Sequence, residues 1–247
     1  MLPDASGLPQ PASQGIGVYV NAATGTQLLS NWIGASTMTA MQLRAGVEQA
    51  QVQGNLIGAG FANGDGVVLV GNNFGTASGN RLVGNQITGN TGAGVVMANA
   101  IAGLSLRGNV LRANRIYANG GVEIDLGADG GGADGISLND AGDADAGPNG
   151  RQNYPVLSAP VLTSGLASVD YLVDSESGSY DIELVYSTAC DASGHGPGGQ
   201  ILADPLIFEG QPDQGTLVFP VPVLPGNGYI SATATAIDIG TSEYGAC

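Results

Sequence analysis

Apolar residues recur in pairs at alternate positions along the first half of the chain. In four of the five copies a glycine directly precedes the pair. The pairs are Val18 and Val20, Met41 and Leu43, Val67 and Leu69, Val95 and Met97, and Val122 and Ile124. They begin 23, 26, 28 and 27 residues apart. Alternation with a period of two is typical of β-strands, so each copy predicts a short strand with one buried face.

A second pattern, Asn-x-Ile, falls between the copies of the first, at Asn31, Asn55, Asn85 and Asn114. Two interleaved strand patterns with one common interval predict a coil of parallel strands, in which every turn supplies one strand to each face. A repeat of helices would instead show a period of 3.6 residues. We therefore expect an all-β protein whose residues 1–157 form a right-handed parallel β-helix, a pectin-lyase-like solenoid of about five rungs that ends in an acidic closing loop.

The repeat also predicts where individual side chains lie. Asparagine tolerates a left-handed backbone at strand corners, and stacked amides can bond from turn to turn, so we expect asparagine ladders. We expect one inward column of valines: Val18, Val67, Val95 and Val122. Glu123 and Asp125 alternate with the apolar residues of the last copy, so they should point outward into solvent.

The second half of the chain loses the long repeat and keeps the strand pattern. Six or seven short apolar runs, separated by Gly, Pro and Asp, predict a small immunoglobulin-like β-sandwich over residues 158–247. The two cysteines, Cys190 and Cys247, both fall in this part. We expect them to form a disulfide in an oxidising compartment, and the alternative is two free buried thiols.

Charge narrows the choice of partners. The chain has 21 acidic residues and 6 basic residues, a formal net charge of −15, and every basic residue is an arginine. Such a surface repels nucleic acid and anionic membranes. No apolar run is long enough to span a membrane, and the first ten residues lack the features of a signal peptide, which fits either a cytosolic protein or part of a longer secreted one.

Acidic residues are concentrated after the last repeat, where six aspartates between residues 125 and 145 precede the next base, Arg151. Asp143, Asp145 and Asn149 fall at alternate positions with Gly147, and Asp140 lies just before them. Oxygen ligands at this density suit a hard cation, so Asp140, Asp143, Asp145 and Asn149 are candidate calcium ligands. The alternative is a solvated acidic linker.

The sequence around this acidic segment resembles a known arrangement. The stretches GVEIDLG (121–127), NDAGDADAGPN (139–149) and QNYPVL (152–157) are similar to the closing segment of right-handed β-helix repeat regions in large bacterial surface proteins. In those regions a β-sandwich follows, and residues 190–194 and 230–247 resemble it. The segment 236–240 departs from the pattern, since it lacks the usual Asn before Thr-Ser-Glu. The resemblance implies a secreted or surface-displayed structural role and no catalytic residues.

We therefore expect a non-catalytic structural or adhesive module of a longer secreted or cell-surface bacterial protein, stabilised by calcium. Its partner would be an extracellular glycan or a host or cell-surface molecule, with no nucleic acid and no membrane insertion. One alternative is a polysaccharide lyase, hydrolase or epimerase, because parallel β-helices often bind acidic glycans. Another is a calcium-dependent or glycan-binding module without catalysis.

The enzyme alternatives name specific residues. Glu123 and Asp125 lie two residues apart and would serve as acid and base. Arg107, Arg112 and Arg115 are the one cluster of bases, either a substrate contact or scattered surface residues. Cys190 lies five residues before His195, the single histidine, so a thiol and base pair is conceivable unless a disulfide removes the thiol.

Overall fold

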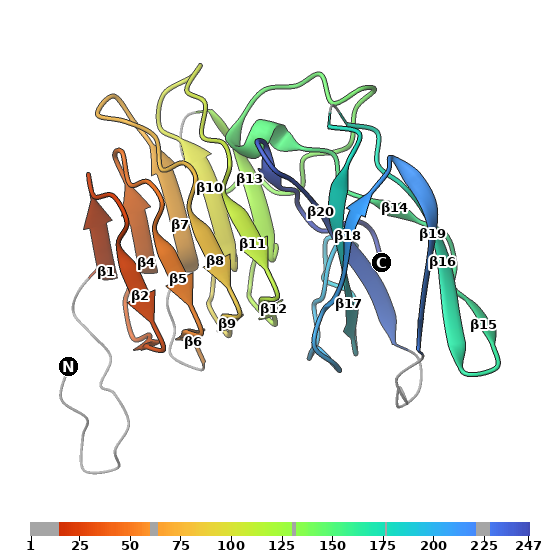
Figure 1. Cartoon of the computed structure of the whole chain (residues 1–247). Helices are drawn as coiled ribbons and strands as arrows, with labels where there is room; N and C mark the ends of the chain where they lie inside the picture. The colour runs from red at the N-terminus through yellow and green to blue at the C-terminus, as the bar shows by residue number, and fades with distance from the viewer. Residues whose placement is uncertain (1–14, 60–63, 130–131, 176, 221–227) are drawn as a thin grey trace, which may run out of the picture.

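The computed structural model describes residues 15–59, 64–129, 132–175, 177–220 and 228–247 (Figure 1). Its first half is a coil of three parallel sheets. The first sheet contains β1 (Ile16–Asn21), β4 (Thr39–Arg44), β7 (Asp65–Gly71), β10 (Val95–Asn99) and β13 (Ile124–Asp129). The second contains β2 (Gln27–Leu29), β5 (Gln51–Gln53), β8 (Arg81–Val83) and β11 (Val110–Arg112). The third contains β3 (Trp32–Ile33), β6 (Leu56–Gly58), β9 (Gln86–Thr88) and β12 (Arg115–Tyr117).

These sheets confirm the predicted parallel β-solenoid, since each strand pairs in parallel with the strand one turn away. The expected count of about five rungs is wrong. The predicted count came from the strands of the first sheet, which has five, whereas the other two sheets have four each. The coil makes about three turns. The chain leaves the coil after β13 because the acidic segment follows in place of another pair of strands.

The inward column of the first sheet runs through Val18, Met41, Val67, Val95 and Ile124, which are register partners from turn to turn. The prediction for its last member was therefore wrong, because Ile124 stands where Val122 was expected. The apolar alternation extends for three residues in the last copy, at 122, 124 and 126, so the pattern alone fits two registers. The four inner members from Met41 onward are at most 2% exposed.

The asparagine ladders are confirmed. Asn85 Nδ2 donates to Asn114 Oδ1 at 2.9 Å, and Asn85 Oδ1 accepts from the Asn55 backbone N–H at 3.0 Å. The same geometry links Asn80 to Asn109 and Asn90 to Asn119. Each side chain thereby satisfies backbone groups at a corner where the sheets leave them unpaired, and asparagine is suited to this because its amide both donates and accepts.

Two antiparallel sheets follow the coil. The first contains β14 (Val156–Leu157), β15 (Val161–Thr163), β16 (Leu166–Leu172) and β19 (Gln214–Pro220). The second contains β17 (Tyr180–Ser187), β18 (Leu206–Gln211), β20 (Tyr229–Ala236) and β21 (Gly240–Thr241). A short 3-10 helix, η1 (Pro148–Arg151), precedes them.

Both antiparallel sheets contribute side chains to one apolar core, for example Val169 of β16 and Ile182 of β17. A second contact joins this part of the molecule to the coil. Val185 and Tyr244 belong to the same buried cluster as the inward residues of the coil, so the antiparallel part covers the last turn directly. Among the described residues, no helix has the length and apolar character needed to cross a membrane.

Candidate functional site

Three aspartates of the closing loop form an acidic cluster. Asp140, Asp143 and Asp145 each place a carboxylate oxygen within 4.8 Å of the others. Asp143 is buried and has a left-handed backbone, with φ of 55°. Oxygen atoms at this separation could bind one metal ion, and hard cations such as Ca²⁺ prefer oxygen ligands.

The cluster is held by the segment that follows η1 and by the loop after β16. The Asn153 backbone N–H donates to Asp143 Oδ1 at 3.0 Å, and Asn153 Nδ2 donates to the Asp140 carbonyl at 2.7 Å. Ser175 Oγ donates to Asp143 Oδ2 at 2.5 Å, and the Gly142 N–H donates to Asp174 Oδ2 at 3.1 Å. The acidic cluster therefore lies where the closing loop meets the antiparallel sheets.

Electrostatics at the cluster favour a cation. Burial raises the pKa of the Asp145 carboxyl above its usual range, and the negative charges of Asp140 and Asp143 raise it further, while Arg151 opposes them. Asp145 Oδ1 is buried and has no hydrogen-bond partner in the part of the chain that the structure describes. An ion that contacts this oxygen would relieve both the repulsion and the loss of solvation.

Asn149, the fourth candidate ligand, uses its side-chain amide in bonds to Asn109 and Thr241. Its Oδ1 accepts from the Asn109 N–H at 3.2 Å, and its Nδ2 donates to the Asn109 and Thr241 carbonyls at 2.8 and 3.0 Å. The side chain thus adds a further member to the ladder of Asn80 and Asn109. The spacing predicted Asn149 as a metal ligand, whereas in the structure it lies within η1 and its Oδ1 accepts from the last turn of the coil.

The closing end of the coil, formed by β11, β12 and β13, is covered by side chains from the antiparallel part. The Leu111 N–H donates to Thr241 Oγ1 at 2.9 Å, and the Ala113 N–H donates to Glu183 Oε2 at 2.7 Å. Segment 239–241 also runs beside the last turn like a further strand: Asn109 and Gly240 form a parallel bridge. These contacts satisfy backbone groups that a next turn would otherwise pair.

Glu243 completes this cover at β13. Its Oε1 accepts from the Leu126 N–H and its Oε2 from the Ser137 N–H, both at 2.7 Å. One carboxylate therefore joins the end of the first sheet to the closing loop. Glu183 and Glu243 were not among the predicted site residues, although Thr-Ser-Glu at 241–243 is part of the resemblance.

Three glutamates at the closing end are buried: Glu123, Glu183 and Glu243 are 2%, 6% and 1% exposed. Burial raises the pKa of Glu123 and of Glu243 to about 8 and that of Glu183 to about 7, although hydrogen bonds from backbone N–H groups partly oppose the shift. Carboxyl groups in this environment resist ionisation because the charged form loses solvation.

The expectation that Glu123 and Asp125 face solvent was wrong. Both point out of the coil, but Asp125 is fully buried and accepts from the Gly135 N–H at 2.9 Å. Glu123 accepts from Asn119 Nδ2 at 2.5 Å. Burial, together with the charges of Glu183 and Glu123, raises the pKa of the Tyr244 phenol. The closing loop and the C-terminal segment cover this pair, so it lines no open groove for a polysaccharide.

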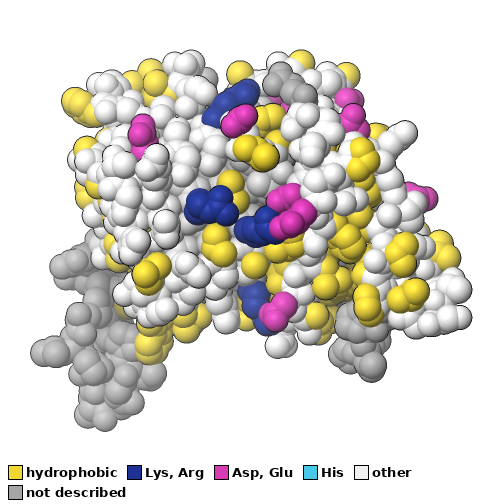
Figure 2. All heavy atoms as spheres, in the orientation of Figure 1, with side chains coloured by type: hydrophobic (Ala, Val, Ile, Leu, Met, Phe, Trp, Pro, Cys, Tyr) yellow, Lys and Arg dark blue, Asp and Glu magenta, His cyan; other side chains and the backbone are white. Residues whose placement is uncertain are grey.

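Two of the three arginines of the predicted cluster, Arg112 and Arg115, contact the antiparallel part of the molecule. Arg112 Nη1 lies 2.7 Å from Asp181 Oδ2, and its other amino nitrogen contacts Glu209. Arg115 donates to the Ile201 carbonyl at 2.7 Å and lies 3.5 Å from Asp204. Figure 2 shows these charges of both signs meeting in the middle of one face, between the coil and the antiparallel sheets. The two arginines thus contact the protein's own acids.

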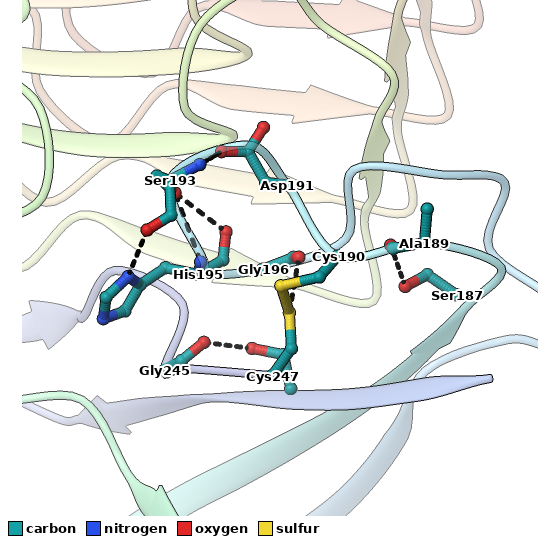
Figure 3. The surroundings of a disulfide bond; sticks show 10 residues. Ser187, Ala189, Cys190, Asp191, Ser193, His195, Gly196, Gly245 and Cys247 are labelled. Carbon is teal, nitrogen blue, oxygen red and sulfur yellow. Dashed lines mark hydrogen bonds between the residues drawn. A yellow bond between two sulfur atoms is a disulfide. The ribbon is translucent and has the colours of Figure 1, made fainter. Parts of the chain in front are cut away.

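A disulfide joins Cys190 to Cys247, with an S–S distance of 2.08 Å and a Cα separation of 5.9 Å. Figure 3 shows it tying the loop after β17 to the end of the chain, beside His195. The described part of the chain has no free cysteine, so the thiol and base pair is excluded. His195 instead lies against Tyr154, with 3.2 Å between Nε2 and the phenol oxygen. A disulfide is typical of an oxidising compartment.

No protein-family model matches the chain, and no curated protein matches it. The structure therefore supports the resemblance only at the level of architecture: a parallel β-solenoid with asparagine ladders, followed by antiparallel sheets. Membership of a family does not follow from it.

Proposed function

We propose that this chain is a non-catalytic structural or adhesive module of a secreted or cell-surface bacterial protein, in which a right-handed coil is closed by an immunoglobulin-like sandwich. The observation that carries the proposal is the covered closing end, where Glu183, Thr241 and Glu243 occupy the backbone groups of the last turn. Uncovered sheet ends can pair with strands of other molecules and cause aggregation, so a cover of this kind is expected in a stable extracellular solenoid. The disulfide supports an extracellular location.

The enzyme alternative has less support, because the acids that it requires are enclosed. Glu123 and Asp125 would need contact with a glycan, yet both are buried under the protein's own segments. The partner that we propose is an extracellular glycan or a protein on a host or cell surface.

Localisation and activity can be tested together. Antibody labelling of intact, unpermeabilised cells of the source organism should detect the chain. Incubation of the purified protein with neutral and acidic polysaccharides should release no new reducing ends and no unsaturated sugars. Labelling that appears only after permeabilisation would contradict the location. Cleavage that disappears in a Glu123→Gln and Asp125→Asn variant would establish the enzyme.

We further propose that the acidic cluster binds calcium and so stabilises the junction. An ion that binds only the folded state contributes about 2.7 kcal/mol at a concentration one hundred times its Kd. For a chain of this size that corresponds to a rise in Tm of about 5–10 °C. Tm should therefore rise with calcium and fall with chelator.

The calcium response should be lost in the Asp143→Ala and Asp145→Ala double variant. A matched control replaces two exposed aspartates outside the cluster, Asp204→Ala with Asp238→Ala, and should keep the response. Melting curves of the unaltered protein that coincide in calcium and chelator would show that calcium does not stabilise the junction.

A further inference from the structure

A cleft lies where the last turn of the coil meets the antiparallel part of the molecule. Its volume is about 560 Å³, which falls within the usual range for small-ligand sites. The coil contributes Arg107, which precedes β11, and the rest of the lining comes from β17, β18, β20 and the loops that flank them. None of the lining residues belongs to the acidic cluster, so the cleft is a separate surface with its own chemistry.

Arg107 is the basic residue of this cleft, and the described chain supplies no acid to neutralise it. Arg112, Arg115 and Arg151 each form ion pairs with acidic side chains, whereas Arg107 forms none with any residue that the structure describes. A guanidinium is always charged and can donate two parallel hydrogen bonds to one carboxylate. In a chain with 21 acidic residues, a half-buried arginine without an acidic partner is therefore available to the carboxylate of a ligand.

Contacts with both halves of the molecule hold Arg107 in position. Its backbone N–H donates to Ser78 Oγ at 3.3 Å, and the N–H of the next residue, Gly108, donates to the Ile239 carbonyl at 2.9 Å. The guanidinium lies against Gly150 of η1, where an added Cβ atom would stand only 3.0 Å from Nη2. The glycine thus leaves room for the guanidinium beside the cleft. A side chain that is held before its ligand arrives loses less conformational freedom on binding.

The antiparallel part lines the cleft with hydroxyl and carboxylate groups. Tyr180 Oη accepts from the N–H groups of Ser177 and Gly178, both at 3.1 Å, which holds the loop before β17 against the strand. Ser177 and Ser179 of this loop line the cleft, and so does Asp238, which is exposed in the turn between β20 and β21. Hydroxyl groups donate and accept, and carboxylates accept, so these side chains suit a ligand that carries hydroxyl groups of its own.

The charges around Arg107 limit the kind of anion that fits. Asp181 and Asp238 also line the cleft, although Asp181 is bonded to Arg112 Nη1 at 2.7 Å. One unpaired guanidinium beside two acids favours a ligand with a single negative charge over a doubly charged phosphate, because like charges repel. Ile237 is 89% exposed at the same cleft and offers an apolar contact. The matching ligand therefore combines one carboxylate, several hydroxyl groups and an apolar face.

We propose that this cleft binds a sugar that bears a carboxylate, such as a uronic or sialic acid unit of an extracellular glycan. Arg107 binds the carboxylate, and Ile237 contacts the apolar face of the ring. The ring hydroxyls bond to the side chains of Ser177, Ser179 and Asp238. The assignment rests on the proposed adhesive function, because it places the glycan partner of that function at the junction of coil and antiparallel sheets.

NMR titration of the full chain with two probes, the methyl glycosides of glucuronic acid and of N-acetylneuraminic acid, tests this site. Their methyl esters keep the ring and lose the charge, so the unaltered protein should bind at least one acid about tenfold more tightly than its ester. Arg107→Gln should lose this preference. The matched control, Arg81→Gln, changes an exposed arginine of β8 and should keep it. No binding of either acid, or a preference that survives in Arg107→Gln, would overturn the proposal.

A second variant keeps the test decisive if Arg107→Gln fails to fold. Ile237→Glu changes an exposed side chain and adds a negative charge at the cleft, so it should weaken binding of the acidic sugar by about tenfold. Full affinity in this variant would contradict the site. Acetate or inorganic phosphate that binds as tightly as the sugars would show a general anion site instead. Sugar binding that appears only in Glu176→Gln would show that this acid, which lies outside the described residues, occupies Arg107.

A glycan array separates this proposal from the adhesive function on which it rests. Acidic glycans should be retained by the unaltered protein and lost in Arg107→Gln. Glycans retained equally by both proteins would refute the cleft as the site and leave the adhesive function in place. An array on which the unaltered protein retains no glycan would remove both the site and the glycan partner.

Discussion

The interior of the coil and its closing end satisfy the same backbone groups in different ways. Inside the coil, Asn85 bonds to Asn55 and Asn114, which are the same residue type 30 and 29 positions away. At the closing end, the Leu126 N–H donates to Glu243, which is 117 positions away and lies outside the repeat. The interior repeats one solution, and the closing end uses a separate side chain for each group.

This difference predicts that substitutions in the ladder and in the covering groups destabilise the protein by different amounts. A ladder amide has a partner on both sides, so its loss disturbs two turns at once. A covering carboxylate such as Glu243 accepts from the last turn and from the closing loop, so its loss disturbs one turn of the coil. We therefore expect a substitution in the ladder to cost more stability than a substitution in the cover.

The largest effect is expected for Asn85→Ala. Asn85 is 1% exposed, and its side chain bonds to the Asn55 N–H, the Val52 carbonyl and the amides of its ladder neighbours. The loss leaves several buried polar groups unpaired, at about 1–3 kcal/mol each, so unfolding free energy should fall by about 3–5 kcal/mol. Urea denaturation measures it.

The control for this variant is Asn31→Ala, at the exposed first position of the same ladder. It should cost under about 1 kcal/mol, because water can replace the lost amide. Equal losses at both positions would mean that the ladder gains nothing from burial, and the proposed contrast with the closing end would fail.

A smaller effect is expected for Glu243→Ala. The change leaves the N–H groups of Leu126 and Ser137 without their acceptor, at about 2–4 kcal/mol in total. Glu243→Gln should lose less, because its amide oxygen can still accept one of the two bonds. Glu209→Ala, at a side chain that is 70% exposed, should change the urea midpoint little. A Glu243→Ala variant as stable as this control would show that Glu243 does not stabilise the closing end.

The same contrast explains how much the sequence could predict. The parallel coil and its asparagine ladders follow from a sequence pattern that recurs in every turn. A wrong strand assignment in one copy therefore disagrees with the other copies. The register of the last strand failed at Ile124 because no later copy exists to fix it. Likewise Glu123 appears exposed when only its own strand is considered, since the segments that bury it lie elsewhere in the chain.

The acidic cluster shows the same limit. Local spacing predicted the grouping of Asp140, Asp143 and Asp145, which lie within six residues. It could not place Asn149, whose position depends on Asn109 and Thr241, 40 and 92 residues away. Contacts between distant segments that follow no repeat leave no periodic signal in a single sequence.

The last prediction concerns pH, and its direction is opposite to that of most surface carboxylates. Glu123, Glu183 and Glu243 have folded pKa values of about 8, 7 and 8, above the usual 4.5 of the unfolded chain. Between these limits the folded state binds more protons than the unfolded state. Stability is therefore greatest below about pH 4.5 for these groups and falls as pH rises through 7 and 8.

Each proton that is bound only in the folded state lowers stability by about 1.4 kcal/mol per pH unit. Urea midpoints should therefore decrease from about pH 5 to pH 7 and level off above about pH 8. General repulsion in an acidic chain gives the same sign, but it is screened by salt, whereas buried groups are screened far less. The slope should thus persist at high salt and become shallower in Glu243→Gln, whose amide cannot ionise. A slope that vanishes in salt, or that is unchanged in this variant, would assign the pH dependence to the surface and separate it from the closing end.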